Sequence, residues 1–169
     1  MLQIRPYQPC DQAGVLAVIL PIQQQEFAIP ITLAQQPDLQ DIPGFYQQGA
    51  GNFWVALADD QVVGTIALRD IGDGAAALRK MFVSAAYRGQ PHQVAAQLLQ
   101  HLLQWAAAQQ LQDIYLGTTP QFVGAQRFYE KHGFAPVEKA VLPAAFPLMV
   151  VDSKFYHYAC DKAATRLQA

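Results

Sequence analysis

The segment from residue 75 to residue 109 constrains the fold more than any other, because it joins a strand, a turn-rich loop and a helix in direct succession. Residues 75–83 form an apolar run that predicts a strand, and residues 93–109 carry apolar side chains at helical spacing. The loop between them opens onto the first helical turn, where backbone N–H groups lack partners within the helix and the helix dipole is positive. We therefore predict that residues 88–95 bind a phosphate-bearing cofactor.

The rest of the chain alternates between short strands and apolar-striped helices. Asp59-Asp60 lies between two apolar strands, which predicts a hairpin. A helix separates the strand at 113–117 from the strand at 75–83, so we expect these two strands to lie parallel. The predicted order is a strand at 2–5, a helix at 11–20, short helical turns at 37–47, strands at 52–58, 61–68 and 75–83, a helix at 93–109, a strand at 113–117, a helix ending at Gly133, and strands at 134–137 and 150–158.

Polar residues and prolines set the expected ends of two of these helices. Asp11 can cap the first helix, and Pro21 is expected to end or kink it, with residues 23–27 able to continue it. Thr118 or Thr119 can cap the later helix, with Pro120 near its first turn.

Composition argues against several classes of function. The chain has 169 residues and a formal net charge of −2, which gives no electrostatic basis for binding nucleic acid or an anionic membrane. No apolar run approaches the roughly 20 residues of a membrane span, and the N-terminus does not resemble a signal peptide. Cys10 and Cys160 do not make a disulfide framework or a metal site. We expect a cytoplasmic protein with one domain at 1–160, a frayed tail at 161–169 and no metal, and its apolar composition suits a homodimer.

Two segments carry recognisable motifs. Residues 90–95 read Gln-Pro-His-Gln-Val-Ala, and residues 125–134 read Ala-Gln-Arg-Phe-Tyr-Glu-Lys-His-Gly-Phe. Together with the order of elements over residues 2–158, they resemble the GNAT family of acetyl-CoA-dependent N-acyltransferases. That family's pyrophosphate loop reads Gln/Arg-x-x-Gly-x-Gly/Ala, so Gln93 replaces its central glycine. Phe122 stands where the family often has asparagine.

The resemblance implies a fold of the α/β (α+β) class. We expect a mixed, mostly antiparallel, twisted sheet of about six to seven strands, flanked by helices. A parallel pair in its middle, with strands ending at Val83 and Gly117, is expected to splay apart.

The resemblance also implies that acetyl-CoA is the cofactor. The exposed backbone of residues 81–83 would pair with the amides of the pantetheine arm, as in strand addition. Backbone N–H groups of residues 90–95 would bind the pyrophosphate; Pro91 has no N–H, and Gln93 can supply its own if its φ is negative. The candidate cofactor-binding residues are Met81, Phe82, Val83, Arg88, Gly89, Gln90, His92, Gln93, Val94 and Ala95.

The candidate catalytic residues are those that could donate or accept a proton during the transfer. Tyr129 occupies the position at which the family places the tyrosine that protonates the leaving thiolate; a buried core aromatic is the alternative. Glu26, in a largely uncharged segment, is the candidate base, although a solvated surface glutamate is the simpler interpretation. Asp152 is a structural or acceptor-site candidate, and deprotonation through water needs no dedicated base.

The resulting hypothesis is direct transfer of an acetyl group from acetyl-CoA to a primary amine. The acceptor is a small-molecule or peptide amine, and the scarcity of charge at 29–32 and 142–147 suggests an apolar acceptor pocket. Two alternatives stay open: a non-catalytic acyl-CoA-binding or partner-binding module that keeps the fold, and a structural domain that binds no CoA.

Overall fold

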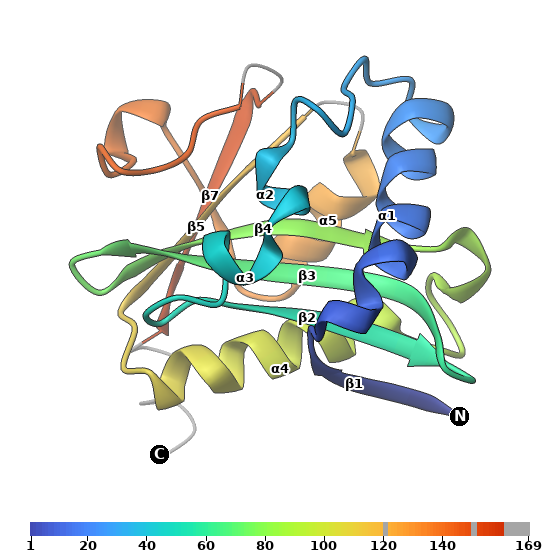
Figure 1. Cartoon of the computed structure of the whole chain (residues 1–169). Coiled ribbons are helices and arrows are strands. Elements are labelled where there is room, and N and C mark those ends of the chain that lie inside the picture. The colour runs from blue at the N-terminus through green and yellow to red at the C-terminus, as the bar shows by residue number, and fades with distance from the viewer. Residues whose placement is uncertain (120–121, 150–151, 161–169) are drawn as a thin grey trace.

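A seven-stranded sheet forms the centre of the molecule in the computed structural model, which describes residues 1–119, 122–149 and 152–160 (Figure 1). The strand order is β1-β2-β3-β4-β5-β7-β6, and only the β4–β5 pair is parallel among these strands. This confirms the expected mixed, mostly antiparallel sheet. The strands are β1 (Leu2–Pro6), β2 (Asn52–Ala58), β3 (Gln61–Gly72), β4 (Ala75–Val83), β5 (Asp113–Thr118), β6 (Ala135–Val137) and β7 (Lys154–Ala159).

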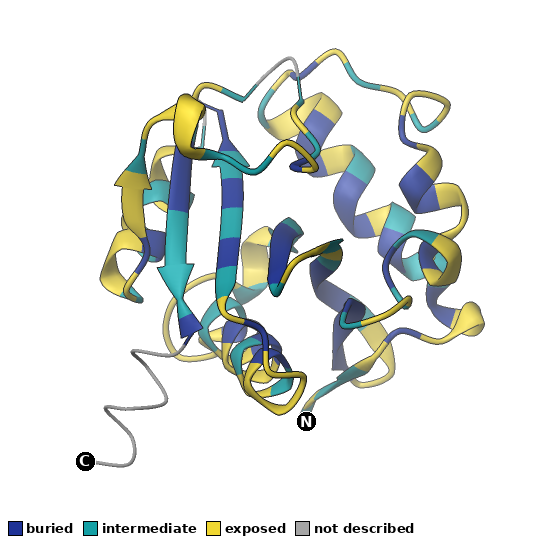
Figure 2. Cartoon of the chain, turned by 90° about the vertical axis from the view of Figure 1, so that its left-hand side faces the viewer, coloured by how far each residue is buried: buried dark blue, intermediate teal, exposed yellow. Residues whose placement is uncertain are grey.

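Helices and helical turns cover both faces of the sheet, as Figures 1 and 2 show from two sides. Buried residues of α1, α2 and α3 form one cluster against the sheet, and those of α4 and α5 belong to another. The α-helices are α1 (Gln12–Pro21), α2 (Pro37–Gln40), α3 (Ile42–Phe45), α4 (Val94–Ala108) and α5 (Val123–Lys131). The other turns are η1 (Pro9–Asp11), the π-helical η2 (Ile22–Glu26), η3 (Ala85–Tyr87) and η4 (Lys139–Val141).

The strand periodicity explains how one sheet supports two cores. Side chains alternate between the faces of a strand, and β2 is buried along its whole length. Phe53 and Val55 pack with α1–α3, whereas Trp54 and Ala56 pack with α4. A strand that is apolar at every position therefore predicts cover on both faces, and the structure provides it.

The central parallel pair separates, as the resemblance implied. β4 and β5 pair only from Ala75–Asp113 to Ala77–Tyr115, although both strands continue beyond that point. The register between β3 and β4 also shifts between Thr65 and Ala67. Opposite this shift Lys80 has a φ of 54°, in the left-handed region. The irregularity breaks the side-chain alternation of β4 just where it leaves β5.

The N-terminal boundary of α1 differs from the prediction. A 3-10 turn at Pro9–Asp11 precedes the helix, and the Asp11 carboxylate does not cap α1. It instead accepts hydrogen bonds from the Arg5 guanidinium at 2.7 and 2.9 Å and from the Gln8 backbone N–H at 2.8 Å. A charge-assisted partner from β1 outweighs the local cap, because such pairs are stronger than a neutral capping bond.

The predicted start of α5 was also wrong. Thr118 ends β5, and α5 begins at Val123 with Phe122 at its N-cap. The Thr119 carbonyl accepts hydrogen bonds from the Phe122 N–H at 3.1 Å and from the Gln126 side chain at 3.0 Å, so it organises the turn before the helix. Pro120 lies outside the described residues.

The C-terminal prediction holds only in part. β7 begins at Lys154, so its described part is shorter than the predicted strand at 150–158. Residues 150–151, and the tail at 161–169, lie outside the described residues. No helix in the three described stretches is long and apolar enough to cross a bilayer.

Candidate active site

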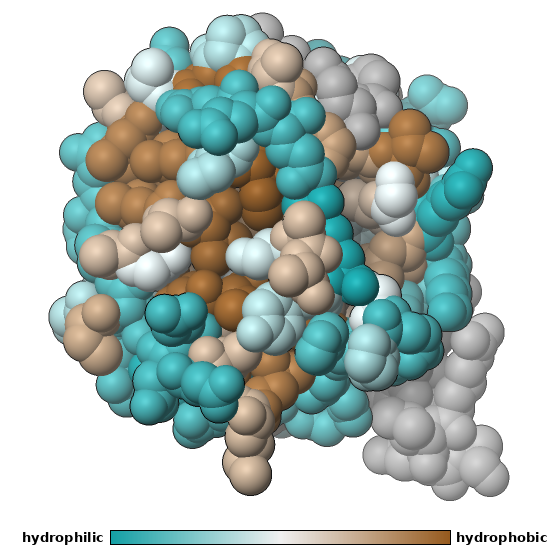
Figure 3. All heavy atoms as spheres, turned by 90° about the vertical axis from the view of Figure 1, so that its right-hand side faces the viewer, coloured by the Kyte–Doolittle hydropathy of each residue, from teal (hydrophilic) through white to brown (hydrophobic). Residues whose placement is uncertain are grey.

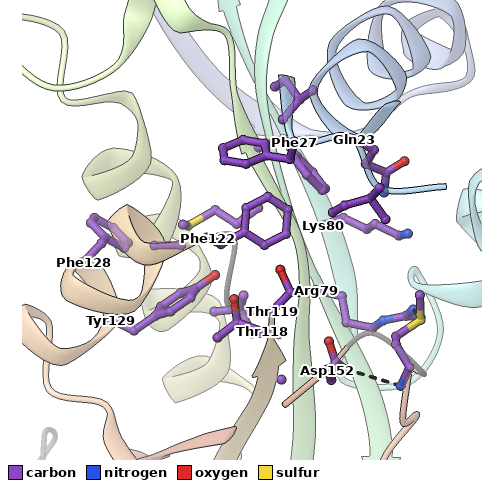
Figure 4. A pocket seen from close by; sticks show the side chains of 18 of the residues that line it. Gln23, Phe27, Arg79, Lys80, Thr118, Thr119, Phe122, Phe128, Tyr129 and Asp152 are labelled. Atoms are coloured by element: carbon purple, nitrogen blue, oxygen red, sulfur yellow. Dashed lines mark hydrogen bonds between the residues drawn. The ribbon is translucent and has the colours of Figure 1, made fainter. Parts of the chain in front are cut away.

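A cavity of about 440 Å³ occupies the place where β4 and β5 part (Figure 4). Its walls come from η2 and the segment after it, from β4 and β5, and from α5, with further side chains from the segment before β7. On the side of the molecule where α1 lies, hydrophobic residues gather around a recess within a hydrophilic rim (Figure 3). The strand separation thus leaves a lined cavity, because no neighbouring strand fills the gap.

The N-terminus of α4 opens beside this cavity. In the described structure the backbone N–H groups of Val94, Ala95 and Ala96 donate to no protein acceptor, and Ala95 lines the cavity. Such unpaired N–H groups at the positive end of a 15-residue helix can bind an anion. The exposed residues Gly89 and Gln90, with His92, form the turn that leads into the helix.

Gln93 corrects one part of the sequence prediction. Its φ is 49°, in the left-handed region, rather than negative. Its N–H donates to the Gly89 carbonyl at 2.8 Å, so that donor is already used within the loop. The motif's glycine is explained by this conformation, which glycine adopts without the steric cost that Gln93 bears.

We expect Gln93→Gly to raise the free energy of unfolding by about 1 kcal/mol, because it removes the left-handed strain from a residue with a side chain. Chemical denaturation monitored by circular dichroism measures the change. Gln97→Gly is the matched control, since Gln97 lies within α4, where glycine costs about 1 kcal/mol. A destabilised Gln93→Gly protein would contradict this account of the loop.

Arg88 ties the predicted cofactor loop at 88–95 to β4 and to η2. Its Nε donates to the Val83 carbonyl at 2.8 Å, and its two Nη atoms donate to Glu26 at 2.5 and 2.7 Å. The hydrogen bonds from Arg88 lower the pKa of Glu26. Arg88, Met81, Phe82 and Val83 line the cavity, and Glu26 does not. The structure therefore brings the candidate base into contact with the cofactor loop, where its carboxylate is occupied by an ion pair.

Tyr129 lies on the opposite wall, on α5. Its side chain is buried and its ring packs near Phe128, Phe134 and Tyr156, yet it also lines the cavity. Its hydroxyl makes no hydrogen bond within the described residues, and burial raises the pKa of Tyr129. The ring of Tyr129 therefore packs as a core aromatic, while the same side chain also reaches the cavity, where an acid would have to lie.

Buried polar groups at one end of the cavity were not foreseen as site residues. The Lys80 ammonium donates to Gln36 Oε1 at 2.5 Å and lies 3.5 Å from Asp38 Oδ2. Gln36 and Gln23 exchange side-chain hydrogen bonds of 2.9 and 3.0 Å, and the Tyr46 hydroxyl donates to Asp38 at 2.5 Å. Burial lowers the pKa of Lys80 to about 8. Two adjacent cations, Arg79-Lys80, within an apolar strand were the sequence signal for this cluster.

Asp152 and Arg79 complete the polar lining. Burial raises the pKa of Asp152, whose carboxylate accepts a 3.4 Å hydrogen bond from the Met149 N–H. The Asp152 carboxylate also abuts Gly117 on β5, where a Cβ atom would lie 2.6 Å from Oδ2. Glycine at that position is required by this close approach. Asp152 lies before β7, which begins at Lys154, and it lines the cavity.

Phe122 takes part in an aromatic wall. Its ring meets Phe27 edge-on at 4.6 Å between centroids, and Phe82 at 6.2 Å. An asparagine here would remove both contacts. Phe122, which stands in place of the asparagine of the motif, therefore packs with two other aromatic residues of the same wall.

Comparison with known proteins agrees with this geometry. Residues 18–134 match the model of the acetyltransferase (GNAT) family. The chain belongs to the GNAT family. This match includes the separating β4–β5 pair, the α4 N-terminus and the α5 motif.

GNAT relatives resemble different extents of the chain. An N-acetylaspartate synthetase from Xenopus tropicalis is 36% identical over 106 residues, which are 62% of this chain and 38% of that protein. The chain thus spans about two fifths of that relative's length. A GNAT acetyltransferase structure from Staphylococcus aureus is 35% identical, with a TM-score of 0.91, over 95% of this chain and 99% of that one.

A more distant GNAT structure shares the fold alone. The PaiA N-acetyltransferase of Thermoplasma acidophilum, solved in complex with coenzyme A, has a TM-score of 0.72 at 16% identity. The alignment covers 94% of this chain and 99% of that one. The sheet and its flanking helices therefore tolerate nearly complete sequence change.

Proposed function

We propose that this GNAT protein transfers an acetyl group from acetyl-CoA to a primary amine. The observation that carries the proposal is the cavity between the separated strands, which has free helix N–H groups at one side and the Tyr129 hydroxyl at another. An anion-binding helix end, an open strand edge and a buried acid are what a thioester-to-amine transfer requires.

The residues present fit CoA as the donor. The N–H groups of Val94, Ala95 and Ala96 would bind the pyrophosphate, and the backbone of residues 81–83 would face the pantetheine arm. Arg88 uses one of the two lone pairs of the Val83 carbonyl, so a pantetheine amide would share that oxygen with Arg88 or displace it. The named CoA complex of a protein with the same fold supports the choice of donor.

The proposed chemistry uses two of the ionisable side chains that line the cavity, Tyr129 and Asp152. The amine nitrogen attacks the thioester carbonyl carbon, and the C–S bond breaks as the amide forms. Tyr129 gives its hydroxyl proton to the departing thiolate, and its raised pKa keeps that proton in place until then. The nitrogen loses one proton to a carboxylate or to water, and solvent returns a proton to Tyr129.

Asp152 is the carboxylate we propose for the amine proton. It lines the cavity and burial raises its pKa, which makes it a better proton acceptor. Glu26, the base proposed from the sequence, lies outside the cavity lining and is held by Arg88. Comparing the turnover of Asp152→Asn with that of Glu26→Gln would show which of the two carboxylates accepts the amine proton.

Calorimetric titration with acetyl-CoA tests the donor directly. We expect saturable binding, and binding at least about tenfold weaker for acetyl-pantetheine, because that analogue lacks the pyrophosphate that the helix N-terminus would hold. Absence of any binding at millimolar acetyl-CoA would refute the proposal. Binding without CoA release across amino acids, polyamines, aminoglycosides and peptides would favour the non-catalytic module.

We propose a cytoplasmic location and a small-molecule or peptide acceptor, and the homodimer rests only on the apolar composition. Cell fractionation tests the location, and analytical ultracentrifugation tests the homodimer.

A further inference from the structure

Arg79 is a largely buried cation with little to bind. Its side chain is 14% exposed, and its only hydrogen bond within the described residues runs from Nη2 to the Met149 sulfur at 3.2 Å. The nearest carboxylate oxygen, Asp38 Oδ2, lies 3.9 Å from Nη1. A guanidinium has five N–H donors, and a thioether is a weak acceptor, so most of its hydrogen-bonding capacity is unused.

The Asp38 carboxylate is not free to satisfy Arg79. It accepts a hydrogen bond from the Tyr46 hydroxyl and lies within ion-pair distance of the Lys80 ammonium, which also donates a hydrogen bond to Gln36. The positive charge of Lys80 is therefore paired within the protein. Of the three cations in the described cavity lining, Arg79 has the longest ion pair, at 3.9 Å from a carboxylate that also pairs with Lys80 at 3.5 Å, whereas Arg88 is 2.5 Å from Glu26. Its planar fork suits a carboxylate in bidentate geometry.

Asp152 offers the complementary charge on the same side of the cavity. Its only hydrogen bond within the described residues is a 3.4 Å contact from the Met149 N–H, and its carboxylate lies against Gly117 near the end of β5. Figure 4 shows Arg79 and Asp152 near each other, with Thr118 and Thr119 beside them. A molecule with a carboxylate and an ammonium on neighbouring atoms could bind both residues.

The rest of the cavity is apolar. Phe27 and Phe122 meet edge-on across it from the polar groups, as the close-up in Figure 4 shows. Ile29 and Ile31 line the same cavity, as do Phe82 and Phe146. This lining favours an aliphatic or aromatic substituent over a second charged group, because no unpaired cation of the described lining is left for it.

We propose that the acceptor is an α-amino acid with an apolar side chain. Its carboxylate binds the Arg79 guanidinium, its amino group lies at Asp152, and its side chain packs against the aromatic wall. This assignment rests on the proposed acetyl transfer and narrows its acceptor. It differs from aspartate, which the name of the N-acetylaspartate synthetase relatives suggests. The other cations of the described lining, Lys80 and Arg88, are already paired with Asp38 and Glu26, so a second carboxylate would have no cation left to bind.

Matched acceptors test the carboxylate requirement on the wild-type protein. Leucine, leucinamide, 3-methylbutylamine and aspartate would be compared by the rate of CoA release from acetyl-CoA. We expect kcat/KM for leucine to exceed that for 3-methylbutylamine by about tenfold or more, mainly through KM, since the two differ only in the carboxylate. Equal use of the two, or a preference for aspartate, would overturn the assignment.

Arg79→Gln tests the residue itself, with Arg69→Gln as the matched control. Arg69 lies on the adjacent strand β3, outside the cavity lining, over the Phe45 ring. We expect Arg79→Gln to lower kcat/KM for leucine, relative to that for 3-methylbutylamine, about tenfold or more, a change in ratio that a general structural defect would not cause. The control should retain the wild-type ratio; a wild-type ratio in Arg79→Gln would refute the role of Arg79.

Binding measurements separate this inference from the donor proposal. Leucine would be titrated into CoA-loaded protein, with the 3-methylbutylamine titration as reference. Leucine binding that Arg79→Gln abolishes supports the assignment even without turnover, and no leucine binding to the wild type overturns it. Failure to bind acetyl-CoA would refute the proposed function instead. If Arg79→Gln does not fold, the acceptor comparison on the wild type still decides.

Discussion

Replacing Tyr129 by phenylalanine is expected to lower turnover by about 10²- to 10⁴-fold, the usual range for loss of a general acid. Tyr129 lines the cavity, into which its hydroxyl points (Figure 4), and this hydroxyl makes no hydrogen bond within the described residues, so its removal breaks no internal hydrogen bond. Burial raises the pKa of Tyr129, so the acid stays protonated across neutral pH. Affinity for acetyl-CoA should be nearly unchanged, because the phenyl ring keeps its packing.

Tyr156→Phe is the control for this prediction. Tyr156 is fully buried beside Tyr129, but its hydroxyl donates to Glu130 at 3.1 Å and does not line the cavity. It should therefore cost a little stability and leave turnover within a small factor of wild type. Steady-state CoA release and calorimetric affinity are measured for both variants. Unchanged turnover in Tyr129→Phe would remove this residue from the mechanism.

The second large effect is on the pH dependence of stability, and it concerns Lys80. Burial lowers the pKa of Lys80 from 10.5 to about 8. Between these values the unfolded chain holds a proton that the folded chain has released, so the unfolded state binds more protons and stability rises with pH. The penalty for the buried charge is complete below about pH 8 and disappears as pH approaches 10.5.

Lys80→Met should remove this pH dependence. We expect the free energy of unfolding of the wild type, relative to the variant, to rise by about 2 to 3 kcal/mol from pH 7 to pH 10. Tyrosines with raised pKa values oppose this trend, but they are present in both proteins and cancel in the difference. Urea denaturation across this pH range measures it.

An exposed lysine provides the comparison for Lys80. Lys139, on η4, has its side chain in water, so Lys139→Met should give a stability curve parallel to that of the wild type. Lys80→Met curves that also run parallel to wild type would contradict the buried-charge interpretation. The result bears on the site, because the same burial leaves Asp38 committed to Lys80 rather than to Arg79.

Local patterns were sufficient for most of the elements. The β2–β3 hairpin around Asp59-Asp60 and the helix α4 follow from periods of two and 3.6, which depend only on neighbours in sequence. The two helix starts that were predicted wrongly involved partners a few residues away that a capping pattern does not include. The Asp11 carboxylate binds Arg5 on β1, and the Thr119 carbonyl accepts hydrogen bonds in a turn before α5.

The candidate site divides in the same way. Residues 88–95 and Tyr129 were identified from contiguous motifs, and the structure places Ala95 and Tyr129 on the lining of one cavity. The conformation of Gln93 was not predictable from the motif match, because a residue with a side chain rarely adopts a φ of 49°. From the sequence, Arg79 and Lys80 are two adjacent charges on a strand. In the structure the irregularity in β4 lets both side chains line the cavity.

The sequence by itself determined the order of strands and helices, the parallel crossover and the helix N-terminus that can hold a phosphate. These follow from local periodicity and from chain connectivity. Only the tertiary structure decided which polar groups share the cavity. Lys80 and Gln36 are 44 residues apart and still hydrogen-bond, and that contact exists only because packing of α2 against the sheet brings distant segments together and excludes water between them.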